Sequence, residues 1–331
     1  MTAVISVIIC THNPRPDSLR RVFDSLAAQT LPRERWELLL VDNASDDRLQ
    51  PLWSLSWHPN ARHVREDQLG LTPARLRGIR ESRGDVLVYV DDDNVLAADY
   101  LETAQSLFAK HPHLGVIGAG ILEPEFATQP SPELVPYLRI LTLRRISSAL
   151  WSNNADDRAA VPWGAGLCVT RGVAEAYVQL LGRLNGLNVD QLLDRRGQQL
   201  FGNGDVVFSW ACVAGGLGFG VFPQLHVTHL IRADRVTQEY FLRLAHDSGF
   251  SGGVFDYLRT GLTPGESVGS VERYLRLVLR GMRKGLFAMR FGLAVSRGEH
   301  QARTFIAGKR LEHITFSACD ADPKLHGARS L

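Results

Sequence analysis

The sequence predicts an α/β protein with a mostly parallel central sheet flanked by helices, followed by a helical extension toward the C-terminus. Strand-like and helix-like segments alternate through the first hundred residues, which is typical of a parallel sheet. The strand-like segments are nearly continuous apolar runs rich in β-branched residues, as in strands buried on both faces. From about Thr237 onward the pattern becomes helical.

Composition narrows the class of protein. The 331 residues are 45% apolar and 22% charged, which indicates a globular chain. The net charge of +2 carries no nucleic-acid-like bias, so we expect no nucleic-acid partner. The four cysteines contain no CxxC pair and are expected to be reduced thiols of a cytoplasmic protein. The apolar run 4–10 is too short for a secretory leader or a membrane span and reads as the first strand.

The remaining elements follow from apolar spacing and from start and stop signals. Asp17 or Ser18 can cap the first helix, and Thr72 with Pro73 is a typical helix start. Residues 123–160 have weak periodicity and several prolines, which predicts a loop-rich insertion. The predicted strands are 4–10, 37–41, 63–65, 86–90, 116–122, 164–170 and 218–222, and the predicted helices are 19–29, 72–82, 100–109 and 205–213.

Polar residues follow three of these strands, at Thr11–Asn13, Asp42–Ser45 and Asp91–Asn94. The carboxyl ends of parallel strands meet at one edge of a sheet, where α/β proteins bind ligands. We therefore expect these residues to converge on one crevice.

Three consecutive aspartates, Asp91, Asp92 and Asp93, close a buried strand. Their repulsion is costly unless a cation or hydrogen-bond donors offset it. Alternate residues of an extended segment face the same way, so Asp91 and Asp93 can reach one ligand together. Oxygen ligands suit Mg²⁺ or Mn²⁺ shared with a diphosphate. The alternative is a solvated turn with helix-capping aspartates.

Asp42 is a single carboxylate at a strand end. It suits recognition of ribose hydroxyls or a base N–H, and an Asx-turn in the loop Asp42–Ser45 explains it equally well. The sequence has neither a GxGxxG after the first strand nor a GxxxxGK[ST] motif, which counts against dinucleotide oxidoreductases and P-loop NTPases.

Taken together, these blocks resemble family 2 glycosyltransferases over roughly residues 4–232. Each block alone is weakly specific, but their order and spacing match the family. The matching blocks are SVIICTHN (6–13), LVDNAS (40–45), GLTPARLRGI (70–79), VYVDDDN (88–94), WGAGL (163–167) and GNGD (202–205).

The resemblance implies a GT-A fold and an inverting transfer of a hexose from a nucleoside-diphosphate sugar to a saccharide or glycolipid hydroxyl. The donor that it implies is a UDP-sugar. Asp93 would ligate Mn²⁺ or Mg²⁺, and Asp205 would be the general base. The donor side would comprise Thr11, Asn13, Asp42, Arg75, Asp91 and Asp92, and the acceptor side Trp163, Gly164, Ala165 and Gly204.

Two positions leave alternatives open. Gly204 stands where the family usually has a glutamate beside the base, so any acceptor contact of that glutamate would be missing, and Asp205 could instead be a plain helix N-cap. His226 and His229 lie after the last predicted strand, where the family often places a further metal ligand. His229 matches that position best, and structural roles for both histidines remain open.

We divide the chain into a catalytic domain, 1–232, and a C-terminal helical region, 233–331. Within the first, 1–122 would bind the nucleotide sugar and 123–232 the acceptor. Residues 271–310 form a basic amphipathic pattern that could lie on an anionic membrane surface at its cytoplasmic side. It could instead be a packed appendage or the interface of a homodimer.

The leading prediction is thus a glycosyltransferase of polysaccharide, glycolipid or glycoconjugate assembly. A sugar-phosphate nucleotidyltransferase would usually carry a glycine-rich basic signature after the first strand, and residues 11–15 lack it. A non-catalytic sugar-nucleotide-binding protein would be favoured by loss of Asp93 or Asp205, and both are present.

Overall fold

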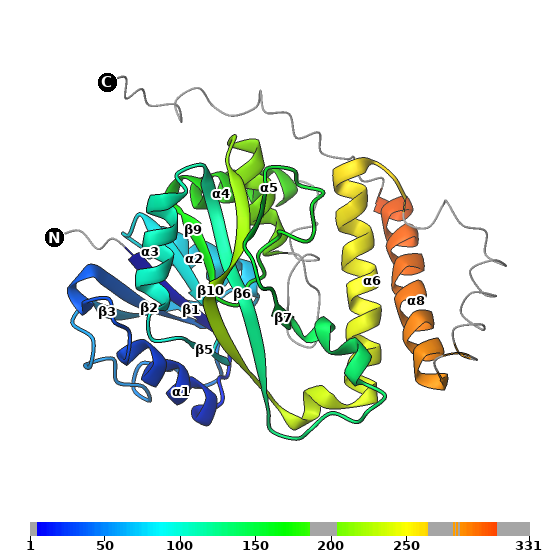
Figure 1. Ribbon diagram of the computed structural model, residues 1–331, viewed down its shortest axis with the longest axis horizontal. Helices are drawn as coiled ribbons and strands as arrows, with labels where there is room; N and C mark the ends of the chain where they lie inside the picture. Colours follow the sequence, from blue (N-terminus) through cyan, green and yellow to red (C-terminus); the bar gives the residue numbers. More distant parts are fainter. Residues whose placement is uncertain (1–4, 186–203, 264–280, 282, 284, 310–331) are drawn as a thin grey trace.

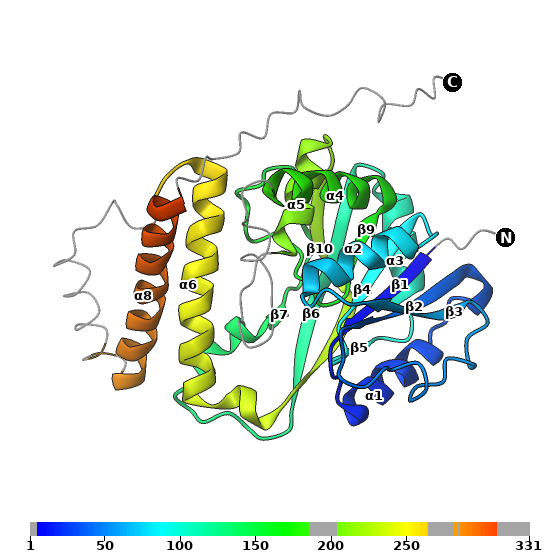
Figure 2. The same cartoon turned by 180° about the vertical axis from the view of Figure 1, so that it is seen from behind.

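The computed structural model describes residues 5–185, 204–263, 281, 283 and 285–309. They form one sheet of ten strands covered by helices on both faces, with a pair of helices beside it (Figures 1 and 2). Eight strands follow the order β3-β2-β1-β4-β9-β6-β10-β5, while β7 pairs with β6 and β8 pairs with β10.

The strands β3, β2, β1 and β4 run parallel to one another, and β9 reverses the direction. Because β6 is antiparallel to β9 and parallel to β10, the sheet is mixed but its long strands point the same way. The strands are β1 Ile5–Thr11, β2 Trp36–Asn43, β3 Ala61–Glu66, β4 Val86–Val90, β5 Asn94–Leu96, β6 Leu114–Phe126, β7 Arg144–Arg145, β8 Leu150–Ser152, β9 Leu167–Thr170 and β10 Gly218–Ile231.

The helices divide between the two faces of the sheet. α1 (Pro16–Ala27) and α3 (Tyr100–Lys110) pack their apolar sides on one face. α2 (Leu71–Glu81), α4 (Arg171–Asn185) and α5 (Val206–Ala214) cover the other. Short 3-10 turns η1 (Arg33–Arg35), η2 (Val135–Leu141) and η4 (Ala233–Val236) complete the described elements.

The C-terminal helices α6 (Gln238–Thr260) and α8 (Leu286–Lys309) lie side by side next to the sheet (Figure 1). The Gly249 and Gly298 positions let the two backbones approach, since a Cβ at Gly298 would lie 2.0 Å from the carbonyl oxygen of His246. Trp210 of α5 stacks on Phe255 of α6 with ring centroids 4.0 Å apart. α6 is therefore packed onto the catalytic core.

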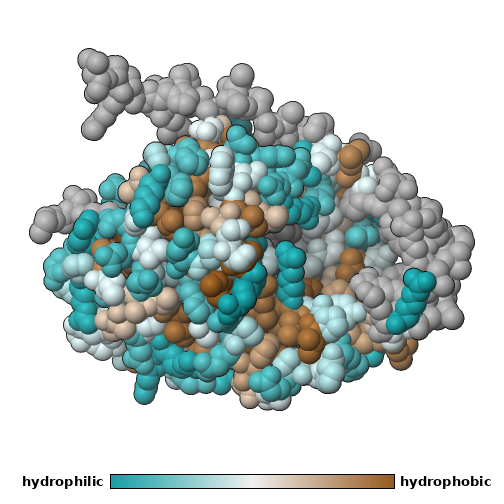
Figure 3. Space-filling model, in the orientation of Figure 1, coloured by the Kyte–Doolittle hydropathy of each residue, from teal (hydrophilic) through white to brown (hydrophobic). Residues whose placement is uncertain are grey.

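On the face that Figure 3 displays, hydrophobic residues lie in separate spots among hydrophilic ones. Among the described residues, no helix is both long enough and apolar enough to cross a bilayer. Cys10, Cys168 and Cys212 are free thiols, as expected, and Cys319 lies outside the described residues. Much of the basic segment 271–310 lies outside them too.

The predicted strands and helices occur in the expected order, with corrections at the starts of α1 and α2 and in the last strand. α1 starts at Pro16 with Arg15 as its N-cap, so neither Asp17 nor Ser18 caps it. α2 starts at Leu71 with Gly70 as its N-cap, so Thr72 is not the cap.

β10 continues to Ile231, so His226 and His229 lie within the last strand rather than after it. A register shift between Phe222 and His226 interrupts the strand pattern there. The helix α4 and the short strands β5, β7 and β8 were not predicted.

Candidate active site

Strand register brings the predicted polar ends together. Thr11 pairs with Asp42 across β1 and β2, and Ile9 pairs with Val90, which directly precedes Asp91. On the far side of the aspartates, His229 of β10 pairs with Asn94 of β5. The expected convergence at the carboxyl edge of the sheet is confirmed by this register.

Asp92 faces back toward β1. Its carboxylate accepts a short hydrogen bond from the Thr11 hydroxyl. Burial of the carboxyl, together with the negative charge of Asp93, raises the pKa of Asp92 to about 7. Asp92 therefore takes up a proton more readily than an ordinary exposed aspartate.

Asp93 lies against two cationic or metal-ligating side chains of the chain's later part. Arg235 of η4 donates from Nη1 to Oδ2 of Asp93 at 2.8 Å. Nε2 of His229 lies 3.6 Å from the same oxygen, while its Nδ1 is 3.1 Å from the carbonyl oxygen of Leu141. A carbonyl partner fixes the tautomer that leaves Nε2 with its lone pair toward Asp93.

The two candidate histidines differ in their neighbours. His226 lies with Nε2 3.1 Å from Glu123, whereas His229 faces Asp93. Geometry thus favours His229 over His226 as the histidine of this site. The structure describes no group of three His, Cys, Asp or Glu side chains already arranged around one point.

Asp42 is buried and its carboxylate organises the loop that follows β2. Its oxygens accept hydrogen bonds from the backbone N–H of Ser45 at 3.1 Å and of Leu49 at 3.2 Å, and from Arg65 at 2.7 Å. Burial alone would raise the pKa of Asp42, but bonds from Ser45, Arg65 and Leu49 outweigh it and lower that pKa. Asp42 thus stabilises its loop, but through the N–H three residues on rather than two residues on as in an Asx-turn, and a nucleotide contact stays a prediction.

Asn13 joins the loops after β1 and β2. It has a left-handed backbone, φ 49°, and its N–H donates to the Ser45 hydroxyl at 3.0 Å. Its side chain exchanges hydrogen bonds with Asp46, accepting from the Asp46 N–H at 3.0 Å. Asn13 therefore shapes the rim of the crevice through these loop contacts.

Asp205 and the Gly164 turn meet on the acceptor side. Asp205 caps α5 by accepting from the Val206 N–H at 3.0 Å, and its other oxygen accepts from the Gly164 N–H at 2.7 Å. A Cβ at Gly164 would lie 3.0 Å from Nη2 of Arg75 and 3.7 Å from Oδ2 of Asp205. The N-cap role is thus real, and Asp205 also faces a second element.

Arg75 links the two halves of the site. It is buried on α2, its guanidinium lies 5.9 Å from the ring centroid of Tyr89 on β4, and it approaches Gly164 as described. Arg75 thus places a positive charge beside Gly164 and Asp205.

The remaining acceptor-side predictions lie around the Gly164 turn. Ala165 is buried, and Gly166 has a left-handed φ of 72° with its carbonyl accepting from the Tyr100 hydroxyl. Gly204 is a buried turn residue directly before Asp205, while the preceding 202 and 203 lie outside the described residues. Trp163 is half-buried beneath Arg144, whose guanidinium carbon lies 3.9 Å from the ring centroid.

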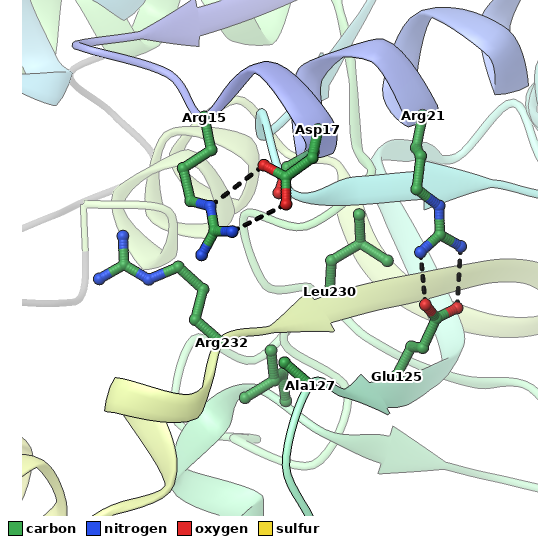
Figure 4. Close-up of a pocket in the computed structure, with 9 residues that line it drawn as sticks. Arg15, Asp17, Arg21, Glu125, Ala127, Leu230 and Arg232 are labelled. Carbon is green, nitrogen blue, oxygen red and sulfur yellow. Dashed lines mark hydrogen bonds and ion pairs between the residues drawn. The ribbon is translucent and has the colours of Figure 1, made fainter.

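A separate pocket lies between the start of α1 and the ends of β6 and β10 (Figure 4). Its arginines are paired with carboxylates: Arg15 contacts Asp17 at 2.7 Å, and Arg21 makes a two-pronged contact with Glu125 (Figure 4). Arg232 pairs with Asp234. Because each of these arginines is paired with a carboxylate, the pocket carries little uncompensated charge. The pairs are exposed, so each contributes little to stability.

Arg235 and Arg144 are site residues that sequence reasoning missed. Each is a single arginine outside the recognised blocks, and Arg235 reaches Asp93 across 142 positions of sequence. The signal that could have found Arg235 is its place six residues after His229, in the segment that follows the last strand.

Comparison with known proteins adds independent information. Residues 6–147 match the profile described as Glycosyl transferase family 2. This part of the chain is similar to glycosyl transferase family 2. The match covers the aspartate cluster, Asp42 and Arg75, but ends before Asp205 and His229.

Curated relatives support the same family. A glucosyl-dolichyl phosphate glucuronosyltransferase of Haloferax volcanii is 27% identical over 136 residues, covering 40% of this chain and 42% of the relative. The glycosyltransferase AglE of the same organism is 29% identical over 105 residues, covering 31% and 34%. The chain therefore matches less than half the length of these family 2 relatives.

A solved structure supports the fold. The mannosyltransferase PcManGT of Pyrobaculum calidifontis, in complex with GDP-Man and Mn²⁺, superposes with a TM-score of 0.50 at 18% identity, covering 93% of this chain and 74% of that one. The fold is of the GT-A type that the family resemblance predicted.

Proposed function

We propose that the protein is a metal-dependent, inverting glycosyltransferase that moves a hexose from a nucleoside-diphosphate sugar to an acceptor hydroxyl. The observation that carries the proposal is the pair of neighbouring carboxylates Asp92 and Asp93, with His229 facing Asp93, together with a third carboxylate, Asp205, at the Gly164 turn. The first feature suits a cation with a diphosphate, and the second suits proton abstraction.

Asp93 and His229 would hold the metal, Mn²⁺ or Mg²⁺. Their facing atoms, Oδ2 and Nε2, are 3.6 Å apart, and carboxylate with imidazole suits Mn²⁺. Asp91 and Asp92 place two further carboxyl groups next to Asp93, where Arg235 already contributes one positive charge. When bound, the metal would neutralise the departing diphosphate.

The chain's own residues would supply binding and proton transfer. Thr11, Asn13 and Asp42 lie along the proposed nucleotide side, with Asp91 near the ribose. Arg75 would face the diphosphate. Asp205 would take the acceptor proton as the acceptor oxygen bonds to the anomeric carbon, while the bond to the diphosphate breaks on the opposite face. Asp205 is held for this role by Gly164 and by its own helix.

A direct assay tests the reaction. The full chain is incubated with Mn²⁺ and a panel of UDP- and GDP-sugars, and nucleoside diphosphate release is measured with and without saccharide acceptors. We expect release from one donor, with loss of about 10²–10⁴-fold in Asp205→Asn while nucleotide affinity is kept. Release of pyrophosphate instead would indicate a nucleotidyltransferase. Activity within about threefold of wild type in Asp205→Asn would leave that residue as a cap only.

Metal dependence has its own test. Calorimetry of UDP and GDP binding is carried out with Mn²⁺, with EDTA, and on Asp93→Ala. We expect tight binding in the first condition alone. Equal affinity in all three would contradict a metal held by Asp93.

We further propose that the C-terminal region governs localisation or assembly, at the cytoplasmic face of a membrane or in a homodimer. Its described part supports this only through the exposed basic side chains of Arg290 and Arg297 on α8. Flotation with anionic vesicles at rising salt tests the first role, and light scattering tests the second. Neither vesicle binding nor a dimer would leave α6 and α8 as a packed appendage.

A further inference from the structure

Arg144 is a buried cation with incomplete bonding. It lies on β7, is 8% exposed, and donates from Nη2 to the carbonyl oxygen of Val161 at 2.9 Å. Its Nη1 is shielded from solvent and has no hydrogen-bond partner in the described part of the chain. A buried donor left in this state costs roughly 1–3 kcal/mol, and more on a charged group.

A second arginine shares the same aromatic ring. The guanidinium carbons of Arg144 and Arg139 lie 3.9 Å and 6.0 Å from the ring centroid of Trp163. Burial, and then the charge of Arg139, lower the pKa of Arg144 to about 10, so it stays charged at neutral pH. Within the described ranges, neither arginine forms an ion pair with a carboxylate. The two guanidinium charges therefore lie beside one indole ring without an ion-paired carboxylate in the described ranges.

The cluster belongs to the acceptor wall. Trp163 immediately precedes Gly164, whose N–H donates to Asp205. The charge of Asp205 is also felt at Arg144. Trp163 is only half-buried and Arg139 is exposed, so the cluster has an open side. An anion that met both guanidinium groups would lie beside the proposed base.

We propose that Arg144 and Arg139, carried by Trp163, bind a phosphate group of the acceptor, so that the acceptor class is phosphate-bearing. Phosphate oxygens can accept from two guanidinium forks at once, whereas one carboxylate is satisfied by a single fork. The assignment to the acceptor rests on the proposed function, because it takes Asp205 as the base that meets the acceptor hydroxyl.

The test uses the full chain and a matched pair of probes, glucose 6-phosphate and glucose, with glucuronate as a third. Calorimetry measures each probe on wild type, Arg144→Gln, Arg144→Lys and Arg139→Gln. Arg145→Gln is the control. Arg145 directly follows Arg144 in the sequence, but its own guanidinium already pairs with Glu123. We expect glucose 6-phosphate to bind at least tenfold tighter than glucose. That advantage should fall at least tenfold in Arg144→Gln and Arg139→Gln and change less than twofold in Arg145→Gln.

Several results would overturn the proposal. Glucose 6-phosphate binding no tighter than glucose would remove the subsite, and glucuronate binding equally well would remove its phosphate class. A parallel loss of UDP affinity in Arg144→Gln would assign the anion to the donor. If Arg144→Gln fails to fold by circular dichroism, the exposed Arg139→Gln still decides.

Donor cleavage is scored separately in the same preparations. If glucose 6-phosphate binding depends on the arginines but no donor releases a nucleoside diphosphate, the proposed function fails and the anion subsite stands. If a donor is cleaved but phosphate binding ignores the arginines, the subsite alone fails.

Discussion

Arg235 contacts Asp93, the proposed metal ligand, and its removal should have two opposite effects. The perturbation is Arg235→Gln. The pair has a 2.8 Å contact, and the two side chains are only 18% and 14% exposed. Breaking a buried pair costs about 3–5 kcal/mol, and the residual exposure here favours the lower end, about 3 kcal/mol.

At roughly 2.1 cal/mol/K of unfolding entropy per residue, each kcal/mol lowers Tm by about 1.4 °C in a chain of 331 residues, so Arg235→Gln should melt roughly 4 °C lower in EDTA. On the proposed function, this variant also removes the guanidinium that would compete with a metal ion for Asp93. We therefore expect its Mn²⁺ affinity without nucleotide to rise about tenfold, which corresponds to about 1.4 kcal/mol. Mn²⁺ should then raise Tm more in the variant than in wild type.

Differential scanning calorimetry and Mn²⁺ titration by electron paramagnetic resonance measure both effects. Arg232→Gln is the matched control, since its pair with Asp234 is 38% and 59% exposed and should contribute less than about 1 kcal/mol. An Arg235→Gln protein that melts with wild type and binds Mn²⁺ no more tightly would refute the competition.

Two further perturbations follow from the packing. Burial, and then the charge of Arg33, lower the pKa of His58 to about 4, below its unfolded value near 6.5, so the neutral ring stabilises the fold. That stabilisation is complete above pH 6.5 and falls by up to about 3 kcal/mol as the pH drops to 4, which urea unfolding at several pH values should detect and His58→Phe should flatten. Gly298→Ala should lose about 1–3 kcal/mol through overpacking of α6 on α8, because its Cβ would meet the His246 carbonyl at 2.0 Å. Gly252→Ala on α6 meets nothing within 4 Å and should be neutral or stabilising by up to about 1 kcal/mol; equal melting of the two variants would contradict the close helix crossing.

The sequence was informative where one physical rule acts over a continuous segment. β1, β2 and β4 are uninterrupted apolar runs, and their register then placed Thr11, Asp42 and Asp91 at one edge without further assumptions. α4 was missed although Val173, Ala174, Tyr177, Leu180 and Leu181 have helical spacing and are buried. The spacing of these apolar residues by itself predicts a helix.

The predicted end of β10 was wrong for a different reason. Pro223 and the register shift after Phe222 interrupt the alternation of the strand, so its second half does not look continuous with its first. The consequence reached the site, because His229 is oriented toward Asp93 by its place in that second half. Its position could be predicted from the family resemblance, but its orientation depended on the bulge.

Contacts between residues far apart in the sequence cross the predicted domain boundary at 232. A division at 232 separates the predicted catalytic domain from the helical region, yet Arg235 of η4 contacts Asp93, and Ile231 packs with Tyr240 and Phe241 of α6. Trp210 of α5, the helix that Asp205 caps, stacks on Phe255 of the same helix α6. The first turn after β10 therefore supplies a charge to Asp93, while α6 packs against the helix that Asp205 caps. A chain truncated near residue 232 would lose both contacts at once, so reduced activity in such a chain would not by itself show that the helical region takes part in localisation.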